Sequence, residues 1–185
     1  MARVVVLTGV SSAGKSSLAR TMQGQSKRDW LHVSLDQFIS MIPNGREIAP
    51  EWFRVEDQGE PTGPPEISFT NGPRGAQLMQ SMRDFVAAAA SRGLDVIVDD
   101  VCTLSEVNDY RSQLSSHDLT VVRVDVGLET AEQREQARGD RMIGLARQQF
   151  GRIHQGIVFD LAVRNDDGGL DACAAAILAV VDGDA

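Results

Sequence analysis

A glycine-rich segment near the start of the chain has the residue types and spacing that bind phosphate groups. Residues Gly9 to Ser16 read Gly-Val-Ser-Ser-Ala-Gly-Lys-Ser and match G-x-x-x-x-G-K-[ST] at every fixed position. Glycines let backbone N–H groups wrap a phosphate, and the N-terminus of a following helix adds partial positive charge. Lys15 can reach the β- and γ-phosphates of a nucleotide, and the Ser16 hydroxyl can coordinate Mg²⁺.

This segment, here called the phosphate loop, is therefore the expected nucleotide site. A dinucleotide-binding loop would need G-x-G-x-x-G, which the glycines at 9 and 14 do not provide. The expected nucleotide contacts in the loop are Gly9, Ser11, Ser12, Ala13, Gly14, Lys15, Ser16 and Ser17.

Asp36 follows an apolar segment, residues 31–35, that we expect to be a strand. A carboxylate at that end of a strand can accept the proton of an attacking hydroxyl group. The alternative is that Asp36 is the N-cap of a short helix over 36–41 that stops at Pro43, since aspartate is a favoured cap residue. The residues alone leave both interpretations open.

Two further carboxylates, Asp99 and Asp100, end the β-branched segment Val96 to Val98. This is the usual setting of a Walker-B-like acid that holds Mg²⁺ directly or through water. Because successive strand residues face opposite ways, we expect one of the two to face the phosphate loop, and the sequence does not decide which. The alternative is that both acids are solvated at the end of the strand.

An arginine-rich stretch comes later in the chain. Arg134, Arg138 and Arg141 are spaced four and three apart, so they share one helix face, and two more arginines follow at 147 and 152. A guanidinium group bonds two phosphate oxygens at once and stays charged. We expect a lid over residues 130–155 that closes on ATP. The alternative is a solvated face paired with acids at 132, 135 and 140.

The elements that must position these residues alternate between strand and helix. Strands are predicted at 4–8, 31–35, 95–100, 119–126 and 157–163, and helices at 16–23, 36–41, 77–91, from 103 onward, 130–150 and 170–181. This order predicts an α/β fold with a five-stranded, mostly parallel sheet between helices, as one domain over 1–185. Site residues are then expected beyond the carboxyl ends of the strands.

Residues 43–75 interrupt this alternation. All six prolines fall there, with five glycines and the aromatic pair Trp52 and Phe53. We expect an irregular or hairpin-bearing insertion, and long connections of this kind are usually functional. The aromatic pair makes it the best location for an organic substrate pocket.

Composition narrows the function further. The chain has 185 residues and a formal charge of −8, which argues against a general nucleic-acid or anionic-membrane partner. No apolar run approaches the roughly 18 residues that span a bilayer. The two cysteines have no metal or disulfide spacing. These features predict a cytoplasmic protein and leave a homo-oligomer open.

Several segments together resemble the chloramphenicol phosphotransferase family of P-loop kinases. The similarity runs from about residue 3 to 165, through the phosphate loop, Ser34-Leu-Asp36 and Val98-Asp-Asp-Val101. Its most particular segment is Arg134-Glu-Gln-Ala-Arg-Gly-Asp-Arg141, and His154-Gln-Gly-Ile-Val-Phe-Asp160 continues it. The pattern departs over 43–75, and Gln155 and Phe159 stand where the family has an acid and a tyrosine.

The resemblance implies a nucleoside-kinase-like fold, ATP with Mg²⁺ as the donor, and a hydroxyl group of a small molecule, such as chloramphenicol, as the acceptor. It also implies that Asp36 is the general base and that Arg138 and Arg141 contact the nucleotide phosphates. The alternatives are a kinase of a sugar, metabolite or UDP-sugar, in the manner of zeta toxins, and a non-catalytic nucleotide-binding switch. The sequence leaves open whether the role is antibiotic resistance, self-protection or metabolism.

Overall fold

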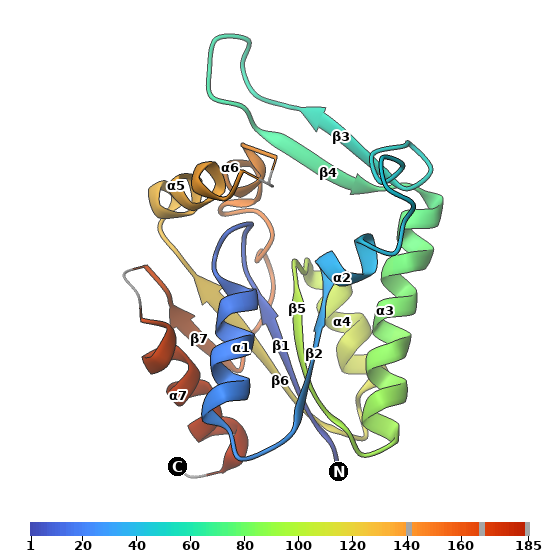
Figure 1. Cartoon of the computed structure of the whole chain (residues 1–185), viewed down its shortest axis with the longest axis vertical. Coiled ribbons are helices and arrows are strands. Elements are labelled where there is room, and N and C mark those ends of the chain that lie inside the picture. Colours follow the sequence, from blue (N-terminus) through green and yellow to red (C-terminus); the bar gives the residue numbers. More distant parts are fainter. Residues whose placement is uncertain (140–141, 167–168, 184–185) are drawn as a thin grey trace.

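A five-stranded parallel sheet forms the centre of the protein (Figure 1). The computed structural model describes residues 1–139, 142–166 and 169–183. The strand order is β2-β5-β1-β6-β7, and every neighbouring pair is parallel. The strands are β1 (Arg3–Thr8), β2 (Trp30–Ser34), β5 (Asp95–Asp100), β6 (Asp118–Asp125) and β7 (Leu161–Arg164). All five therefore end at one edge, as βαβ connections require.

Helices cover both faces of this sheet, which makes three layers (Figure 1). One face carries α1 (Lys15–Gln25) and α7 (Leu170–Asp182), and the other carries α3 (Pro73–Ser91) and α4 (Leu104–Gln113). The side chains of β1 alternate between them: Val5 and Leu7 pack toward α1 and α7, whereas Val4 and Val6 pack toward α3 and α4. Burial on both faces explains the continuous β-branched run that predicted this strand.

Five smaller elements stand beyond the carboxyl edge of the sheet. An antiparallel hairpin is formed by β3 (Phe53–Asp57) and β4 (Ile67–Asn71), close to the start of α3 (Figure 1). The short helix α2 (Leu35–Ile39) follows β2, and α5 (Leu128–Arg138) and α6 (Leu145–Gln149) lie across from the hairpin. We call residues 128–155, which include α5 and α6, the α5–α6 segment. The hairpin and this segment touch, because Ile67 N–H donates to the Gly144 carbonyl at 3.1 Å.

The predicted architecture is confirmed, with local differences. The α3 helix begins at Pro73 rather than at 77, because Gly72 is its N-cap and proline suits the first helical turn. The last strand is Leu161–Arg164 rather than 157–163. Where the sequence predicted one helix over 130–150, the structure has α5 and α6, and Gly139 and Gly144 between them both have positive φ. No helix among the described residues is long and apolar enough to cross a membrane.

Candidate active site

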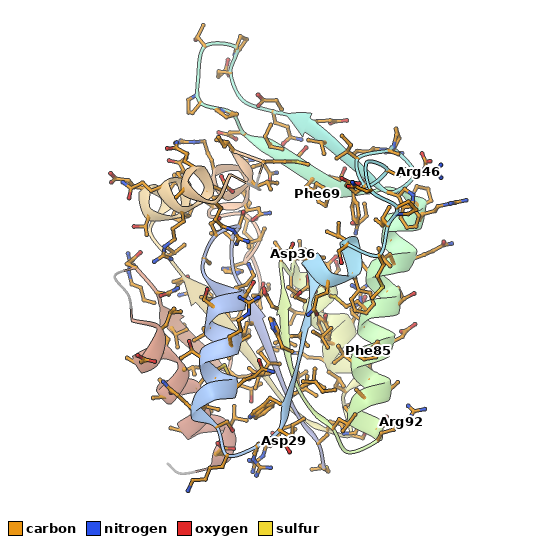
Figure 2. All side chains as sticks on the ribbon, in the orientation of Figure 1. Asp29, Asp36, Arg46, Phe69, Phe85 and Arg92 are labelled. Carbon is orange, nitrogen blue, oxygen red and sulfur yellow. The ribbon has the colours of Figure 1, made fainter. Side chains whose placement is uncertain are left out.

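A single cavity of about 800 Å³ brings most of the predicted site residues together. Its walls come from the phosphate loop, α2, the hairpin, α3, the end of β5 and the α5–α6 segment. Figure 2 shows Asp36 on α2 and Phe69 on β4 facing the same space beneath the hairpin. The site therefore has a phosphate-loop side and a hairpin side, and Asp36 stands between the two.

At both fixed glycines of the phosphate loop, neighbouring atoms lie too close to leave room for a side chain. A Cβ atom on Gly9 would lie 2.5 Å from the Val124 carbonyl oxygen. Gly14 has φ of 89° and is the N-cap of α1, and a Cβ atom there would lie 2.3 Å from Asn165 Nδ2. Because α1 begins at Lys15, the N–H groups of its first turn have no intrahelical partner and are available to an anion.

Lys15 is buried across the loop rather than extended into solvent. Its Nζ donates to the carbonyl oxygens of Gly9 and Val10, at 2.9 and 3.1 Å. These bonds hold the ammonium group at the start of the loop. Most of the residues that were expected to contact the nucleotide line the cavity: Ser11, Ser12, Gly14, Lys15, Ser16, Ser17 and Arg138. Gly9 and Ala13 belong to the loop but are not lining residues, and Gly9 packs against Val124 instead.

The structure separates the two adjacent acids at the end of β5. Asp99 faces the loop and accepts a hydrogen bond of 2.5 Å from Ser16 Oγ. Its Oδ2 also lies 3.8 Å from His32 Nε2. Burial raises the pKa of Asp99, but His32, Lys15 and Ser16 together outweigh burial and hold the pKa below its usual value. Asp99 is therefore a carboxylate beside the Ser16 hydroxyl.

Asp100 has different hydrogen-bond partners from Asp99, and its pKa is shifted the other way. Its carboxylate accepts hydrogen bonds from the Val101 N–H at 2.7 Å and from the Tyr110 hydroxyl at 3.1 Å. Burial raises its pKa, and the hydrogen bonds from Val101 and Tyr110 oppose that change only in part. The alternative that both acids are solvated at the strand end is wrong, because Asp99 and Asp100 are each more than nine-tenths buried.

Asp36 does not cap the helix that contains it. The N-cap of α2 is Ser34, whose hydroxyl accepts from Gln37 N–H while Gln37 Oε1 accepts from Ser34 N–H. Asp36 is two residues further on, with an exposed side chain on the cavity wall. The interpretation of Asp36 as a cap is therefore wrong, and its carboxylate is placed at the cavity instead.

The arginines of the α5–α6 segment serve different parts of the structure. Arg138 lines the cavity, whereas Arg134 donates to the backbone carbonyls of Asn165 and Asp166, at 2.9 and 2.5 Å. Arg147 forms an ion pair with Glu132. For this arginine, the alternative that the arginines pair with neighbouring acids is therefore the correct one. Arg152 reaches the hairpin and pairs with Glu66 at 3.0 Å. Arg141 lies outside the described residues.

Glu135 is a buried anchor that sequence reasoning assigned to a solvated face. Its side chain is 1% exposed, and its carboxylate accepts from the N–H groups of Gly144 and Ala146, at 3.0 and 2.8 Å. These are the N-cap and second residue of α6, where helix N–H groups lack intrahelical partners. Glu135 therefore fixes α6 to α5. No local pattern could reveal this, since a lone glutamate on a polar helix looks like a surface residue.

The hairpin side of the cavity has an apolar cluster and a buried cation, beside the polar side chains of Glu47, Thr70 and Asn71. Phe53 and Phe69 stack with ring centroids 4.6 Å apart, and Met79 lies near them on α3. Phe53 was expected at an organic pocket, but Trp52 is not among the lining residues and packs against Arg74. Phe69 was missed because pairing with β3, rather than its local sequence, brings it to the cavity.

Arg83 is the buried cation on this side, and the sequence analysis missed it as well. It is 8% exposed and lines the cavity from α3. Its Nη2 donates to Gln80 Oε1 at 2.9 Å, and its Nε lies 3.4 Å from Asp109 Oδ2. The available signal was the i, i+4 spacing of Met79 and Arg83, which puts both on one face of the helix.

The comparison with protein families agrees with this geometry. The family described as "Chloramphenicol phosphotransferase-like protein" matches residues 2–182. The chain belongs to that family. Among curated relatives, a Mycobacterium tuberculosis (strain H37Rv) protein provisionally named an O-phosphotransferase is 29% identical over 163 residues, covering 85% of this chain and 72% of the relative.

Solved structures with the same fold include several kinases. The Mycobacterium tuberculosis APS kinase, in complex with AMPPNP and APS, has a TM-score of 0.66 and 17% identity, covering 98% of each chain. A sugar kinase from Janibacter sp. has a TM-score of 0.64 and 15% identity, covering 98% of this chain and 95% of the other. Shikimate kinase from Acinetobacter baumannii has a TM-score of 0.60 and 12% identity, covering 100% and 94%. At these identities the similarity concerns the fold.

Family and fold together make this chloramphenicol phosphotransferase-like protein a P-loop phosphotransferase. The family resemblance noted in the sequence is thus confirmed. The segment for which that resemblance was weakest, residues 43–75, is the one that forms the hairpin side of the cavity.

Proposed function

We propose that the protein transfers the γ-phosphate of ATP to a hydroxyl group of a small organic molecule. The observation that carries this proposal is the shared cavity, which is lined by the phosphate loop, by Asp36 and by the aromatic cluster of the hairpin side. A kinase needs this arrangement because the donor phosphate and the acceptor hydroxyl must be held in line. A nucleotide switch has no need of an apolar compartment beside the phosphates.

The phosphate loop holds the nucleotide. Its backbone N–H groups and Lys15 surround the phosphates, and Arg138 approaches from α5. Arg134 supports the nucleotide site by holding the backbone at Asn165 and Asp166 beside Gly14. Arg141 is proposed to act with Arg138 on the family resemblance alone.

Ser16 and Asp99 are the residues proposed to hold Mg²⁺. Their oxygens lie 2.5 Å apart beside the loop, and hydroxyl and carboxylate oxygens suit this ion. The described residues contain no group of three or more His, Cys, Asp or Glu side chains that could hold a metal. Two protein ligands fit Mg²⁺, which is usually shared with phosphates and water. Bound there, the ion would neutralise charge on the phosphates.

The hairpin side is proposed to bind the acceptor. The stacked rings of Phe53 and Phe69 offer an apolar surface, and Arg83 offers guanidinium donors near it. An acceptor with an apolar body and an oxygen-bearing group would satisfy both. Its hydroxyl would then lie near Asp36.

Asp36 is proposed as the general base. It accepts the proton of the acceptor hydroxyl as that oxygen bonds to the γ-phosphorus, and the bond from phosphorus to the bridging oxygen of ADP breaks. Arg138 and Lys15 stabilise the charge on the transferring group, so positioning and electrostatics supply most of the acceleration.

The test is transfer of labelled γ-phosphate from Mg·ATP to a panel of hydroxylated compounds, with chloramphenicol, sugars and UDP-sugars in separate arms. Labelled product that depends on an acceptor supports the proposal and identifies the acceptor class. Thermal stabilisation by ATP alone, with no product from any arm, contradicts it and favours the switch. Lys15→Ala serves as the inactive control.

A further inference from the structure

A side chain of the α5–α6 segment is bonded directly to the phosphate loop. The N–H of Ser11 donates to Oε1 of Gln149 at 2.6 Å. Gln149 is the last residue of α6, 138 positions away from Ser11, and both residues line the cavity. No sequence pattern pointed to Gln149.

This bond fixes the orientation of the Gln149 amide. A backbone N–H can only donate, so the atom that meets it is the carbonyl oxygen and the amide nitrogen is on the other side. Nε2 has no hydrogen-bond acceptor within residues 1–139, 142–166 and 169–183, and it is not among the buried side-chain atoms there that lack a partner, so it is not fully buried. The structure thus presents an accessible N–H donor at the phosphate loop.

The position of Ser11 in the loop indicates which phosphate of a bound nucleotide would lie near this donor. Ser11 is the third residue of the loop, and Lys15 Nζ is held by the carbonyls of the first two residues, Gly9 and Val10. The lysine of such loops reaches the β- and γ-phosphates. The N–H groups at the start of α1 lie at the opposite end of the loop. Gln149 therefore flanks the γ end.

We propose that Gln149 recognises the γ-phosphate of the nucleotide. Its Oε1 holds the first part of the phosphate loop through Ser11, and its Nε2 donates a hydrogen bond to a γ-phosphoryl oxygen. The protein thereby distinguishes a nucleoside triphosphate from a diphosphate. This inference rests on the proposed function, because it requires that the loop binds ATP.

The anchoring of α6 gives this contact a consequence for the acceptor. Glu135 fixes the start of α6 to α5, and the Gly144 carbonyl accepts from Ile67 of the hairpin. The short helix thus touches the phosphate loop at one end and the acceptor side at the other. A γ-phosphate bound to Gln149 is held by the same element that bounds the acceptor compartment.

The experiment measures dissociation constants for AMPPNP and for ADP, each with Mg²⁺, by calorimetry on the full chain. Gln149→Glu keeps an oxygen for the Ser11 N–H but replaces the donor with a second acceptor. We expect it to weaken AMPPNP by at least about tenfold, since a lost bond to a charged group carries that effect, and to leave ADP within about twofold. Gln149→Ala should change the same ratio in the same direction.

Gln136→Ala is the matched control, because Gln136 is an exposed glutamine on α5 that does not line the cavity. It should leave both constants unchanged. If Gln149→Glu weakens the binding of AMPPNP and ADP equally, Gln149 has only a structural role. If it weakens the binding of neither, Gln149 has no role at the nucleotide. Either result overturns the inference. If the unaltered protein binds neither nucleotide, the proposed function fails with it. If the unaltered protein transfers phosphate while Gln149→Glu leaves the ratio unchanged, the inference alone fails.

Discussion

The role of general base proposed for Asp36 depends on where one helix begins. Because Ser34 caps α2, the carboxylate of Asp36 is left to the cavity side. Asp36→Asn should lower the transfer rate by about 10²- to 10⁴-fold, the usual contribution of a general base, while the affinity for AMPPNP stays within about twofold. Transfer kinetics and calorimetry measure the two effects.

Asp29→Asn is the control for this change. Asp29 is exposed just before β2, at the opposite end of the strand from Asp36 (Figure 2). It should keep full activity. Turnover that survives Asp36→Asn would show that Asp36 is not the base.

The neighbouring acids Asp99 and Asp100 should differ in their effect on the metal requirement. Asp99 bonds to Ser16, whereas Asp100 bonds to Tyr110 and Val101. Asp99→Asn should raise the Mg²⁺ concentration needed for half-maximal transfer by roughly tenfold or more, since one charged ligand is lost. Asp100→Asn keeps an oxygen for the Val101 N–H but loses the acceptor for the Tyr110 hydroxyl. It should still change that concentration little, because Asp100 does not bond to Ser16. Equal effects in a Mg²⁺ titration would contradict the assignment.

At the scale of elements, the contact between the hairpin and α6 bounds the compartment proposed to bind the acceptor. A Cβ atom on Gly144 would lie 2.6 Å from the Pro65 carbonyl oxygen, so Gly144→Ala should push the hairpin away from α6. We expect a higher KM for the acceptor and a lower free energy of unfolding.

Gly139→Ala is the control that distinguishes the effect of the hairpin contact from the effect of backbone strain. Gly139 and Gly144 both have positive φ, at 67° and 106°, but a Cβ atom on Gly139 meets nothing within 4 Å among the described residues. Gly139→Ala should therefore cost about 1–2 kcal/mol of strain and leave the acceptor KM unchanged. An equal rise in KM for both variants would argue against the hairpin contact.

A carboxylate also joins α5 to the segment that follows β7. Asp166 accepts from the N–H of Gly127, the N-cap of α5, at 2.6 Å. That hydrogen bond, with Arg164 and Arg134, lowers the pKa of Asp166. Its stabilisation is therefore complete above the unfolded pKa of about 4 and is lost as the pH falls through the lower folded value.

Asp166→Ala should thus lower the Tm most at neutral pH. The difference from the unaltered protein should shrink below about pH 4, where the unaltered protein also loses its carboxylate. Thermal unfolding over pH 3 to 7 measures this. A difference that is constant with pH would contradict an electrostatic origin.

At the scale of the whole molecule, nucleotide binding should raise the free energy of unfolding. At a hundredfold excess over Kd, Mg·ATP should add about 2.7 kcal/mol. In a chain of this size that corresponds to roughly 5–10 °C in Tm. Lys15→Ala should remove most of the shift, and a shift of the same size in that variant would show that ATP binds elsewhere.

Local sequence was sufficient for the parts of the protein whose chemistry is contiguous. The phosphate loop was predicted because one strand, one loop and one helix carry its glycines, lysine and serine. The parallel sheet followed from β-branched runs that alternate with helical segments, since strands buried on both faces need such runs. Asp36 and Asp99 could be named because Asp36 closely follows β2 and Asp99 is the second-last residue of β5, at the same edge of the sheet.

Only the tertiary structure decided the contacts made between distant segments. It turned Asp99 rather than Asp100 toward Ser16, buried Glu135 beneath α6, and brought Gln149 to Ser11. It also placed Phe69 and Arg83 on the hairpin side of the cavity. Each of these residues looks ordinary in its own segment, because its role is set by a hydrogen bond or packing partner that the chain supplies from elsewhere. Sequence thus determined the phosphate chemistry, whereas folding determined which side chains surround it.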